Sequence, residues 1–480
     1  MSAAGPPQSA CPLGGRRRAA PRRGDPIRAA GPRRGDHASA PITAIRGALI
    51  DFHADPLIEG VAARRYESDG IVAMRDGRIF ASGAAATVLP TLPAGTRVTT
   101  YAHALITAGF IDSHVHYPQL PIIGAGGKPL LEWLATYTFP AEERYADPAY
   151  ARVVARRYLT ENLRNGITTA AVFCTVHRDS ADVLFDEAFA RGLRLIAGKV
   201  LMDRNAPATL LDTAQSGYDD SKALLDRWHG KGRLAYAITP RFAVTSTPAQ
   251  LEAAGALKRE CPDAYVQSHV AESVAEGELV RRMFPDASSY LDVYARHGLT
   301  GPRTIYGHGV HLTESDFSFL HDTQTAIAHC PTSNNFLGSG LFPLAVATQA
   351  RRPVRVGLAT DLGGGTSFSM LRTMQAGYEV AALAGAPLTP SAMLYLATRG
   401  AARALDLESR VGSLAVGMEA DVAVLDLRST PILDFRMRHV RDIDEALAIQ
   451  MALGDDRAIR ATYVAGRLAW DRDSATPDPV

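Results

Sequence analysis

The chain has 480 residues, of which 46% are hydrophobic and 21% charged, and its formal net charge is +1. This composition is typical of a soluble globular protein, and the length is too great for one small domain. The four cysteines are scattered without a C-x-x-C pair, which argues against a disulfide framework and favours a reducing compartment, so we expect a cytoplasmic protein. No uninterrupted apolar run approaches the roughly 20 residues that span a membrane.

The amino-terminal segment differs in composition from the rest of the chain. Residues 1–40 contain eight arginines against two aspartates, a net charge of +6, so the remaining chain carries −5. The segment is rich in Pro, Gly and Ala with almost no bulky apolar residue, so we expect a disordered tail over 1–41. A nucleic-acid-binding arm and a transit peptide are the alternatives. The acidic body argues against nucleic acid as the main partner.

Two segments that flank the middle of the chain are predicted to form one small β domain. Residues 42–105 alternate apolar with polar residues, and Asp76-Gly77 lies between two such runs, which is a hairpin signal. The strand pattern returns over 408–480, with a second hairpin turn at Ala465-Gly466. We therefore expect the two segments to join in a discontinuous β-sandwich.

Between these segments, residues 106–407 alternate strand-like with helix-like patterns. The clearest helix follows Asp147, a good N-cap, has Pro148 at its first position and ends before Gly166. The eight predicted strands cover 106–115, 168–173, 194–201, 234–239, 264–270, 304–309, 325–330 and 354–360. Eight βα units predict an α/β fold, a TIM-like (β/α)8 barrel, with the active site at the carboxyl ends of the strands.

Candidate metal ligands stand at the ends of three predicted strands. The first strand ends in His114-Val115-His116, and side chains two apart on a strand point the same way, so both imidazoles leave one face together. His269 ends the fifth strand, and Asp361 ends the eighth. A lone H-x-H pair is more often a surface or hydrogen-bonded pair. Three histidines and a carboxylate from three strand ends, however, predict a mononuclear metal site with room for water.

The residues around this site predict hydrolysis. A bound metal ion lowers the pKa of a water molecule toward neutral and so generates hydroxide. Glu272 is placed to move a proton, and Asp361 can accept one from that water. His308, at the end of the sixth strand, either ligates the metal or polarises the substrate. We interpret His297 and His311 as ordinary histidines.

Several of these strand ends resemble the amidohydrolase superfamily. The resemblance rests on G-F-I-D-S-H-V-H at 109–116, S-H-V-A-E at 268–272, G-H at 307–308 and A-T-D at 359–361. No lysine ends the fourth strand, where dinuclear members carry a metal-bridging carbamate, and Thr239-Pro240-Arg241 stands there instead. The H-x-x-E at 269–272 is similar to the mononuclear deaminase branch.

Within that branch the sequence is most similar to the guanine deaminase family. The matching segments are P-L-L-E-W-L-A-T-Y-T-F-P-A-E-E-R at 129–144, T-P-R-F at 239–242, A-H-C-P-T-S-N at 328–334, T-D-L-G-G-G-T-S-F-S-M-L at 360–371 and L-G-D-D-R at 453–457. The resemblance covers roughly residues 43–470. It implies hydrolysis of guanine to xanthine and ammonia in purine catabolism or salvage, one Zn2+ per subunit, and a homodimer.

The resemblance also implies roles for individual residues. These are metal ligation by His114, His116, His269 and Asp361, catalysis by Glu272, His308 and Asp361, and substrate contacts from His116, Gln119, Arg241, Phe242, His269 and Asp361. A neutral, planar purine requires fixed amide and guanidinium donors and an aromatic wall. Arg241 facing the O6 carbonyl would discriminate an oxo purine from an amino one. From the residues alone, a surface salt bridge for Arg241 and core packing for Phe242 stay open.

Two other functions remain as alternatives. A sibling hydrolase would act on another amino-heterocycle, such as 8-oxoguanine, a pterin or a chlorinated triazine, and would differ at Gln119, Arg241 and Phe242. A non-catalytic scaffold would have lost metal ligands, and here every ligand position is filled. Iron is the alternative to zinc, since histidine and carboxylate ligands suit both. The expected partners are guanine and water, with no nucleic acid and no membrane.

Overall fold

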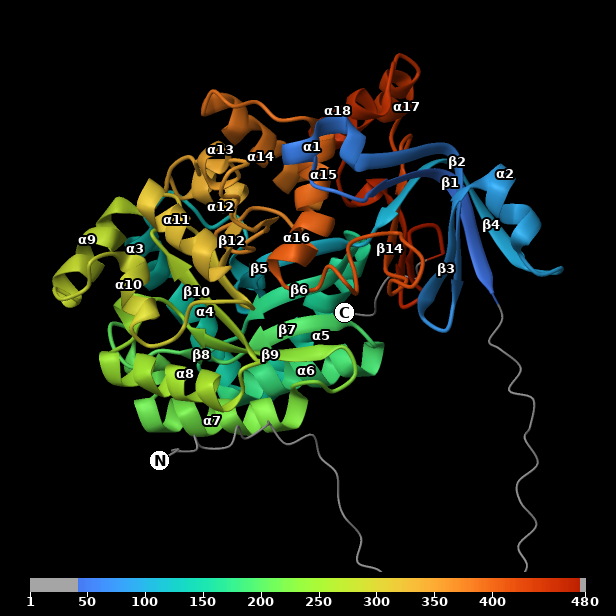
Figure 1. Ribbon diagram of the computed structural model, residues 1–480. Coiled ribbons are helices and arrows are strands. Elements are labelled where there is room, and N and C mark those ends of the chain that lie inside the picture. Colours follow the sequence, from blue (N-terminus) through green and yellow to red (C-terminus); the bar gives the residue numbers. More distant parts are fainter. Residues whose placement is uncertain (1–41, 475–480) are drawn as a thin grey trace, which may run out of the picture.

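The computed structural model describes residues 42–474 (Figure 1). The predicted disordered tail over 1–41 lies outside the described residues. The described chain forms an α/β barrel and a smaller β domain, which confirms the predicted fold class. Among the helices of residues 42–474, none has the length and apolar character needed to cross a membrane.

The small β domain is built from both ends of the described chain. Its strands are β1 (Thr43–Phe52), β2 (Arg64–Arg75), β3 (Arg78–Ala84), β4 (Arg97–Ala108), β14 (Val422–Asp426), β15 (Ile459–Val464) and β16 (Arg467–Asp471). They lie in the order β16-β15-β14-β4-β1-β2-β3. β4 joins the two halves, since it pairs parallel to β1 and antiparallel to β14. Both predicted hairpins are present, with left-handed backbones at Asp76-Gly77 and at Ala465-Gly466.

The barrel is made of parallel strands. They are β5 (Phe110–His116), β6 (Ile167–Phe173), β7 (Arg194–Gly198), β9 (Leu234–Pro240), β10 (Tyr265–Val270), β11 (Thr304–His308), β12 (Ala326–His329) and β13 (Val356–Leu358), with a short β8 (Val200–Leu201) beside β9. Single hydrogen bonds close the barrel between β13 and β5. The Asp361 amide donates to the His114 carbonyl at 3.0 Å, and the Ser113 hydroxyl donates to the Leu358 carbonyl at 2.8 Å.

The strand predicted over 106–115 is wrong, because this apolar run serves two sheets. Ile106 to Ala108 pair with β14 in the small domain, and the barrel strand begins at Phe110. Gly109 separates them, and its amide donates to the Asp421 carbonyl at 2.9 Å. A Cβ at Gly109 would lie 2.3 Å from the Thr168 hydroxyl oxygen, so only glycine permits the two sheets to approach so closely here. A continuous apolar pattern does not reveal such a change of sheet.

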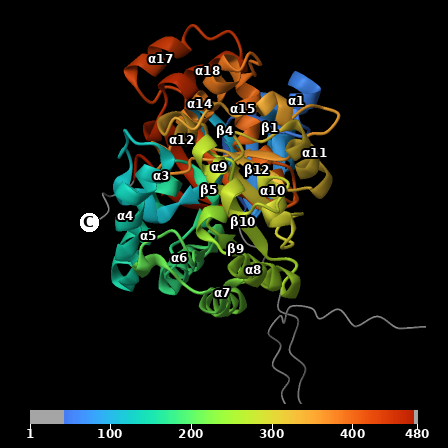
Figure 2. The same ribbon diagram turned by 90° about the vertical axis from the view of Figure 1, so that its left-hand side faces the viewer.

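Helices cover the outside of the barrel, and α5, α6, α7 and α8 follow one another around its lower rim in Figure 2. The helices are α1 (Pro56–Glu59), α2 (Ala85–Val88), α3 (Leu130–Trp133), α4 (Phe139–Glu143), α5 (Pro148–Arg164), α6 (Arg178–Arg191), α7 (Ala214–Trp228), α8 (Pro248–Glu260), α9 (Val274–Met283), α10 (Tyr290–Ala295), α11 (Glu314–Thr323), α12 (Pro331–Phe336), α13 (Leu344–Ala347), α14 (Met370–Leu383), α15 (Pro390–Leu396), α16 (Arg399–Ala404), α17 (Pro431–Met437) and α18 (Ile443–Leu453). α5 begins as predicted, since the Asp147 carboxylate caps it by accepting from the Ala149 amide.

Candidate functional site

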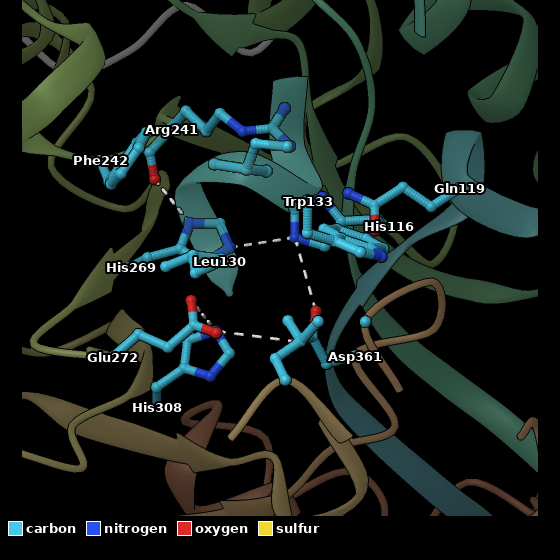
Figure 3. A pocket seen from close by; sticks show the side chains of 13 residues that line it. His116, Gln119, Leu130, Trp133, Arg241, Phe242, His269, Glu272, His308 and Asp361 are labelled. Carbon is cyan, nitrogen blue, oxygen red and sulfur yellow. Dashed lines mark hydrogen bonds and ion pairs between the residues drawn. The ribbon is translucent and has the colours of Figure 1, made fainter. Parts of the chain in front are cut away.

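A pocket opens at the carboxyl ends of the barrel strands (Figure 3). Together with its open mouth it encloses about 380 Å³ of space. Its lining residues are His116, Gln119, Leu130, Trp133, Leu134, Arg241, Phe242, His269, Glu272, His308, Leu337, Asp361 and Gly364. His114 lies behind this lining, 3.4 Å from Asp361. The pocket therefore brings the predicted ligands, proton carriers and substrate contacts together.

His114, behind the pocket, and three residues of its lining present nitrogen or oxygen atoms to one another. The Nε2 atoms of His116 and His269 are 3.0 Å apart, and the Asp361 Oδ1 atom lies 3.6 Å from the His116 Nε2 atom. The same Oδ1 atom lies 3.4 Å from the His114 Nε2 atom. All four side chains are buried. Three imidazoles and one carboxylate at this spacing suit a single divalent metal ion.

Hydrogen bonds fix the orientation of the His269 ring. Its Nδ1 atom lies 2.6 Å from the main-chain carbonyl of Arg241, which can only accept, so this nitrogen carries the proton. The Nε2 lone pair then faces the cluster. The Nε2 atom of His114 is buried and has no hydrogen-bond partner within residues 42–474. Such an unpaired nitrogen is costly in a protein interior unless a metal ion or water engages it, so the residues present fit a bound metal.

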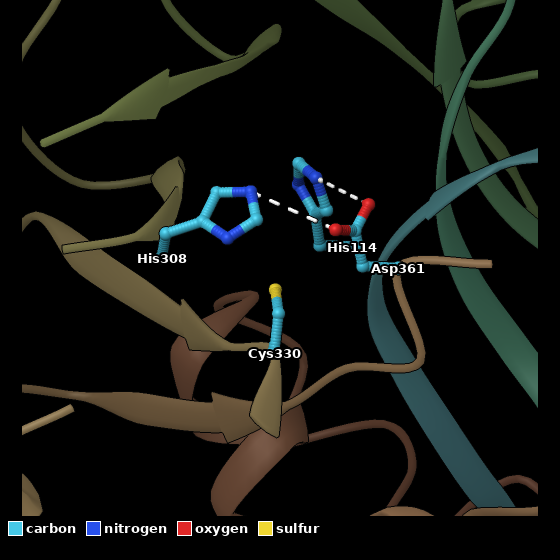
Figure 4. A group of neighbouring side chains, drawn as sticks. All are labelled: His114, His308, Cys330 and Asp361. Carbon is cyan, nitrogen blue, oxygen red and sulfur yellow. Dashed lines mark ion pairs between the residues drawn. The ribbon is translucent and has the colours of Figure 1, made fainter. Parts of the chain in front are cut away.

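A second grouping shares two of these residues and adds His308 and Cys330 (Figure 4). The Cys330 thiol points toward this group (Figure 4), but it donates a hydrogen bond to the Ala328 carbonyl, 3.4 Å from its sulfur. Burial also raises the pKa of this thiol well above its usual value. A buried thiol that keeps its proton is a weaker candidate ligand than a neutral imidazole. The geometry therefore favours His116 and His269 over Cys330.

A third grouping, His229, Cys261 and Asp263, lies before β9 and β10, at the opposite end of the barrel. The main-chain amide of Tyr236 donates to the His229 Nδ1 atom at 3.1 Å. A neutral His229 therefore carries its proton on Nε2, which lies 3.2 Å from the Asp263 carboxylate. A protonated nitrogen cannot bind a metal. This group is accordingly a hydrogen-bonded cluster.

The two carboxyl groups of the pocket differ in acidity. Burial raises the pKa of Glu272 to about 7. Burial acts on Asp361 in the same direction, but the interaction with the His114 imidazole 3.4 Å away, and after it those with His308 and His269, outweigh burial and lower the pKa to about 2. Two carboxyl groups whose pKa values are pushed apart suit different duties, one that can donate a proton near neutrality and one that rests ionised and can accept a proton.

His308 lies between these carboxyl groups. Its Nε2 atom is 3.4 Å from Glu272 Oε2 and 3.7 Å from Asp361 Oδ2, and its Nδ1 atom is 2.8 Å from the Asn334 side-chain oxygen. Burial lowers the pKa of His308, but the charges of Glu272 and Asp361 outweigh burial and raise it. A Cβ at Gly307 would lie 2.7 Å from the His114 ring, so the glycine before His308 leaves room for that imidazole.

The backbone near the site adopts unusual conformations. His308 has a φ angle of 73°, Asp361 of 46°, and Ala271, next to Glu272, of 48°. These left-handed values are uncommon outside glycine and are costly, so the surrounding structure must hold them. Such residues concentrate at functional sites, where the backbone is used to aim side chains.

The predicted substrate contacts line another wall of the pocket. The Arg241 side chain is 2% exposed and its Nη1 atom lies 2.9 and 2.8 Å from the two carboxylate oxygens of Glu142, so it is not the surface salt bridge that the residues alone left open. Phe242 is 4% exposed and lines the pocket as well as packing in the core. Gln119 is buried and packs against Gly363. A Cβ added at Gly363 would lie 2.2 Å from the side-chain oxygen of Gln119, so the glycine leaves room for this amide.

Sequence reasoning missed the residues that support this site from behind. Glu142 pairs with Arg241, Asn334 accepts from His308, and the Ser339 hydroxyl donates to Glu272 at 3.2 Å. Glu142 and Asn334 lie inside the segments that resemble known proteins, but no spacing rule links them to their partners. His297 and His311 lie outside the pocket.

Comparison with known proteins identifies the family. The sequence profile of the amidohydrolase family matches residues 105–469. The chain belongs to the amidohydrolase family. Among curated amidohydrolase relatives, guanine deaminase of Escherichia coli is 45% identical over 434 residues, covering 90% of this chain and 98% of the relative. Probable guanine deaminase of Deinococcus radiodurans is 40% identical over 89% of this chain and 99% of its own length.

Solved amidohydrolase structures agree with this relationship. Guanine deaminase of E. coli superposes with a TM-score of 0.87 at 45% identity, covering 90% of this chain and all of that one. Guanine deaminase of C. acetobutylicum, solved with guanine bound in the active site, gives a TM-score of 0.80 at 27% identity, covering 89% and 99% of the two chains. The barrel and its β domain are thus those of the family.

Proposed function

We propose that this amidohydrolase catalyses the hydrolytic deamination of guanine to xanthine and ammonia. One observation carries the proposal: a single pocket holds three imidazoles and two carboxyl groups of differing pKa on one side, and Gln119, Arg241 and Phe242 on the other. The imidazoles and carboxyl groups suit the activation of water, and Gln119, Arg241 and Phe242 suit the binding of a flat, neutral base. The relationship to guanine deaminases supports the choice of guanine among such bases.

We further propose that His114, His116, His269 and Asp361 hold one zinc ion in each subunit. The bound metal supplies a water molecule acidified enough to act as a nucleophile at neutral pH. Asp361, with a pKa of about 2, is ionised and accepts a proton from the nucleophile. Glu272, with a pKa of about 7, can both give and take a proton near neutrality.

The proton transfers then balance the reaction. Water adds to C2 of guanine, and Glu272 protonates a ring nitrogen beside that carbon. The C2–amino bond breaks as the amino group takes up the proton that Asp361 accepted, and it leaves as ammonia. The second water proton passes to Glu272, replacing the one that Glu272 gave, and the water oxygen becomes the new oxo group of xanthine. His308, between Glu272 and Asp361, is placed to hydrogen-bond the oxygen as it adds.

Substrate choice is assigned to the opposite wall. Arg241 offers guanidinium donors that match a carbonyl oxygen such as O6 of guanine and cannot accept from the amino group of adenine. Phe242 provides an apolar wall, and the Gln119 amide can both donate and accept hydrogen bonds.

The same proposal includes a cytoplasmic location and a homodimer. The reducing location is supported by the cysteines, of which the three within residues 42–474 are all buried.

The test is substrate use by Arg241→Ala, with Arg227→Ala, an arginine half exposed on α7, as the control. One lost buried polar contact is worth about 1–3 kcal/mol, so Arg241→Ala should lose roughly one to two powers of ten in kcat/KM for guanine and keep its zinc content. Arg227→Ala should match the parent. The parent protein could instead prefer 8-oxoguanine, a pterin or a chlorinated triazine, with Arg241→Ala leaving kcat/KM for guanine unchanged. That result would identify a sibling hydrolase.

A further inference from the structure

The Arg241 guanidinium is held by a carboxylate that does not itself line the pocket. Glu142 in α4 is fully buried, and both of its carboxylate oxygens accept from the one Nη1 atom of Arg241. Within residues 42–474 these are the hydrogen bonds that the guanidinium makes, so its Nη2 and Nε donors stay available to a ligand. The ion pair thus balances the charge of Arg241 and leaves two of its nitrogen atoms able to donate hydrogen bonds to a ligand.

The α4 helix contacts the guanidinium in two ways. Phe139 lies three residues before Glu142, on the same side of the helix, and its ring centroid is 5.8 Å from the Arg241 guanidinium carbon. The main-chain carbonyl of Arg241 meanwhile accepts from His269. Arg241 therefore connects α4 to a ring of the proposed metal site, and its side chain has little freedom to move.

The charge balance has a consequence for the ligands that the pocket accepts. An unpaired guanidinium in a buried pocket would attract an anion strongly, because charges interact more strongly where water is excluded. With Glu142 beside it, the pair has no net charge, yet it still offers directed N–H donors. A neutral carbonyl compound then gains hydrogen bonds, whereas an anion meets the Glu142 carboxylate behind the arginine.

We propose that Glu142 is a specificity-determining residue that acts through Arg241, making the pocket favour neutral oxopurines over anionic ones. This inference rests on the proposed purine substrate. It predicts that Glu142 fixes both the direction and the effective charge of the base-reading arginine. Glu142 is thus a positioning residue and takes no part in the proton transfers.

Equilibrium binding to the zinc-loaded full chain tests the charge argument. Calorimetry at pH 7.5 would compare hypoxanthine, a neutral oxopurine, with urate, an anionic one. Glu142→Gln keeps an oxygen that accepts from Arg241 but loses the charge, so the ratio of the urate to the hypoxanthine dissociation constant should fall by about tenfold or more. Glu143→Gln is the matched control, since the neighbouring carboxylate accepts from Thr209 at 2.5 Å and not from Arg241. Its ratio should stay at the parent value.

Glu142→Asp tests the positioning argument in the same assay. Its charge remains but its reach is one methylene shorter, so the binding ratio should stay near the parent value. The KM for guanine should rise about tenfold with kcat nearly unchanged. An unchanged ratio in folded Glu142→Gln would overturn the inference. If that variant does not fold, an unchanged KM in Glu142→Asp would overturn it.

Binding and turnover separate this inference from the proposed function. A parent protein that does not deaminate guanine would contradict the proposed function, while the two dissociation constants could still be measured and compared. Conversely, Glu142→Gln could turn over guanine fully and keep the parent ratio of the urate to the hypoxanthine dissociation constant. This result would support the proposed function but contradict the role of Glu142 in specificity. Replacing both Arg241 and Glu142 by glutamine should return the ratio toward the parent value, because both charges are lost together.

Discussion

The Nε2 atoms of His116 and His269 lie 3.0 Å apart, and His269 places its ring proton on the other nitrogen, against the Arg241 carbonyl. Two zinc–nitrogen bonds in tetrahedral geometry hold their nitrogens about 3.3 Å apart. The spacing of the two rings is therefore close to that of ligands sharing one ion. The strands β5 and β10, far apart in sequence, set this spacing through the curvature of the barrel.

Removal of the metal should abolish activity. Chelation of the purified protein should stop turnover, and added zinc should restore it, because the ligands are protein side chains that remain in place. His116→Ala should lose bound metal as measured by elemental analysis. His297→Ala is the control, because this histidine lies outside the pocket and beside Glu252. Full activity of metal-free protein would contradict the assignment.

Replacement of the proton carrier should separate binding from turnover. Glu272→Gln should keep zinc and guanine binding but lose roughly two or more powers of ten in kcat, the usual contribution of general acid–base assistance. Glu278→Gln, an exposed carboxylate on α9, serves as the control. Single-turnover kinetics would measure both variants. Near parental turnover by Glu272→Gln would show that another group moves the proton.

Asn334 should affect turnover by holding the His308 ring in its orientation. Its side-chain oxygen accepts from the His308 Nδ1 atom at 2.8 Å, which leaves the Nε2 atom to face Glu272 and Asp361. Asn334→Ala should lower kcat by about tenfold while KM changes little, since one neutral hydrogen bond is worth about 1 kcal/mol and misalignment adds to its loss. The adjacent, exposed Asn335→Ala should be neutral. Equal kinetics for the two variants would remove this role from Asn334.

An ion-pair network links the base of the barrel to the β domain and should contribute to stability. Glu419 accepts from Arg194 at 2.5 and 2.7 Å and from Arg233 at 2.8 Å, and it is 12% exposed. Loss of these charge-assisted bonds in Glu419→Gln should cost about 2 kcal/mol, which is about 2 °C in Tm for a chain of this size. Glu314→Gln, in an exposed pair with Arg351, should change Tm little.

The pH dependence of this contribution has a definite sign. Burial alone would raise the pKa of Glu419, but the hydrogen bond and charge of Arg194, together with Arg233, lower it. A carboxyl group with a lowered folded-state pKa stabilises the fold above its unfolded pKa of about 4.3 and loses that effect as the pH falls through the folded value. The Tm difference between parent and Glu419→Gln should therefore shrink in acid. A difference that grows below pH 4 would contradict this account.

The sequence predicted the barrel and the candidate ligands because both depend on local signals. His114-Val115-His116 follows an apolar strand, and the position of a ligand at a strand end follows from the barrel topology. Glu142 could not be found this way, since it lies 99 residues from Arg241 and their contact depends on where α4 packs. The boundary at Gly109 was missed for a different reason, because strands of two sheets follow each other in one apolar run.

The central claim is that this chain converts guanine to xanthine. The most direct measurement follows both products at once, xanthine by chromatography and ammonia by an enzymatic assay, from guanine incubated with zinc-loaded protein. The account predicts one xanthine and one ammonia for each guanine consumed, a far lower rate with adenine, and loss of both products in Glu272→Gln. Zinc-loaded, folded protein that binds guanine but releases neither product would contradict it.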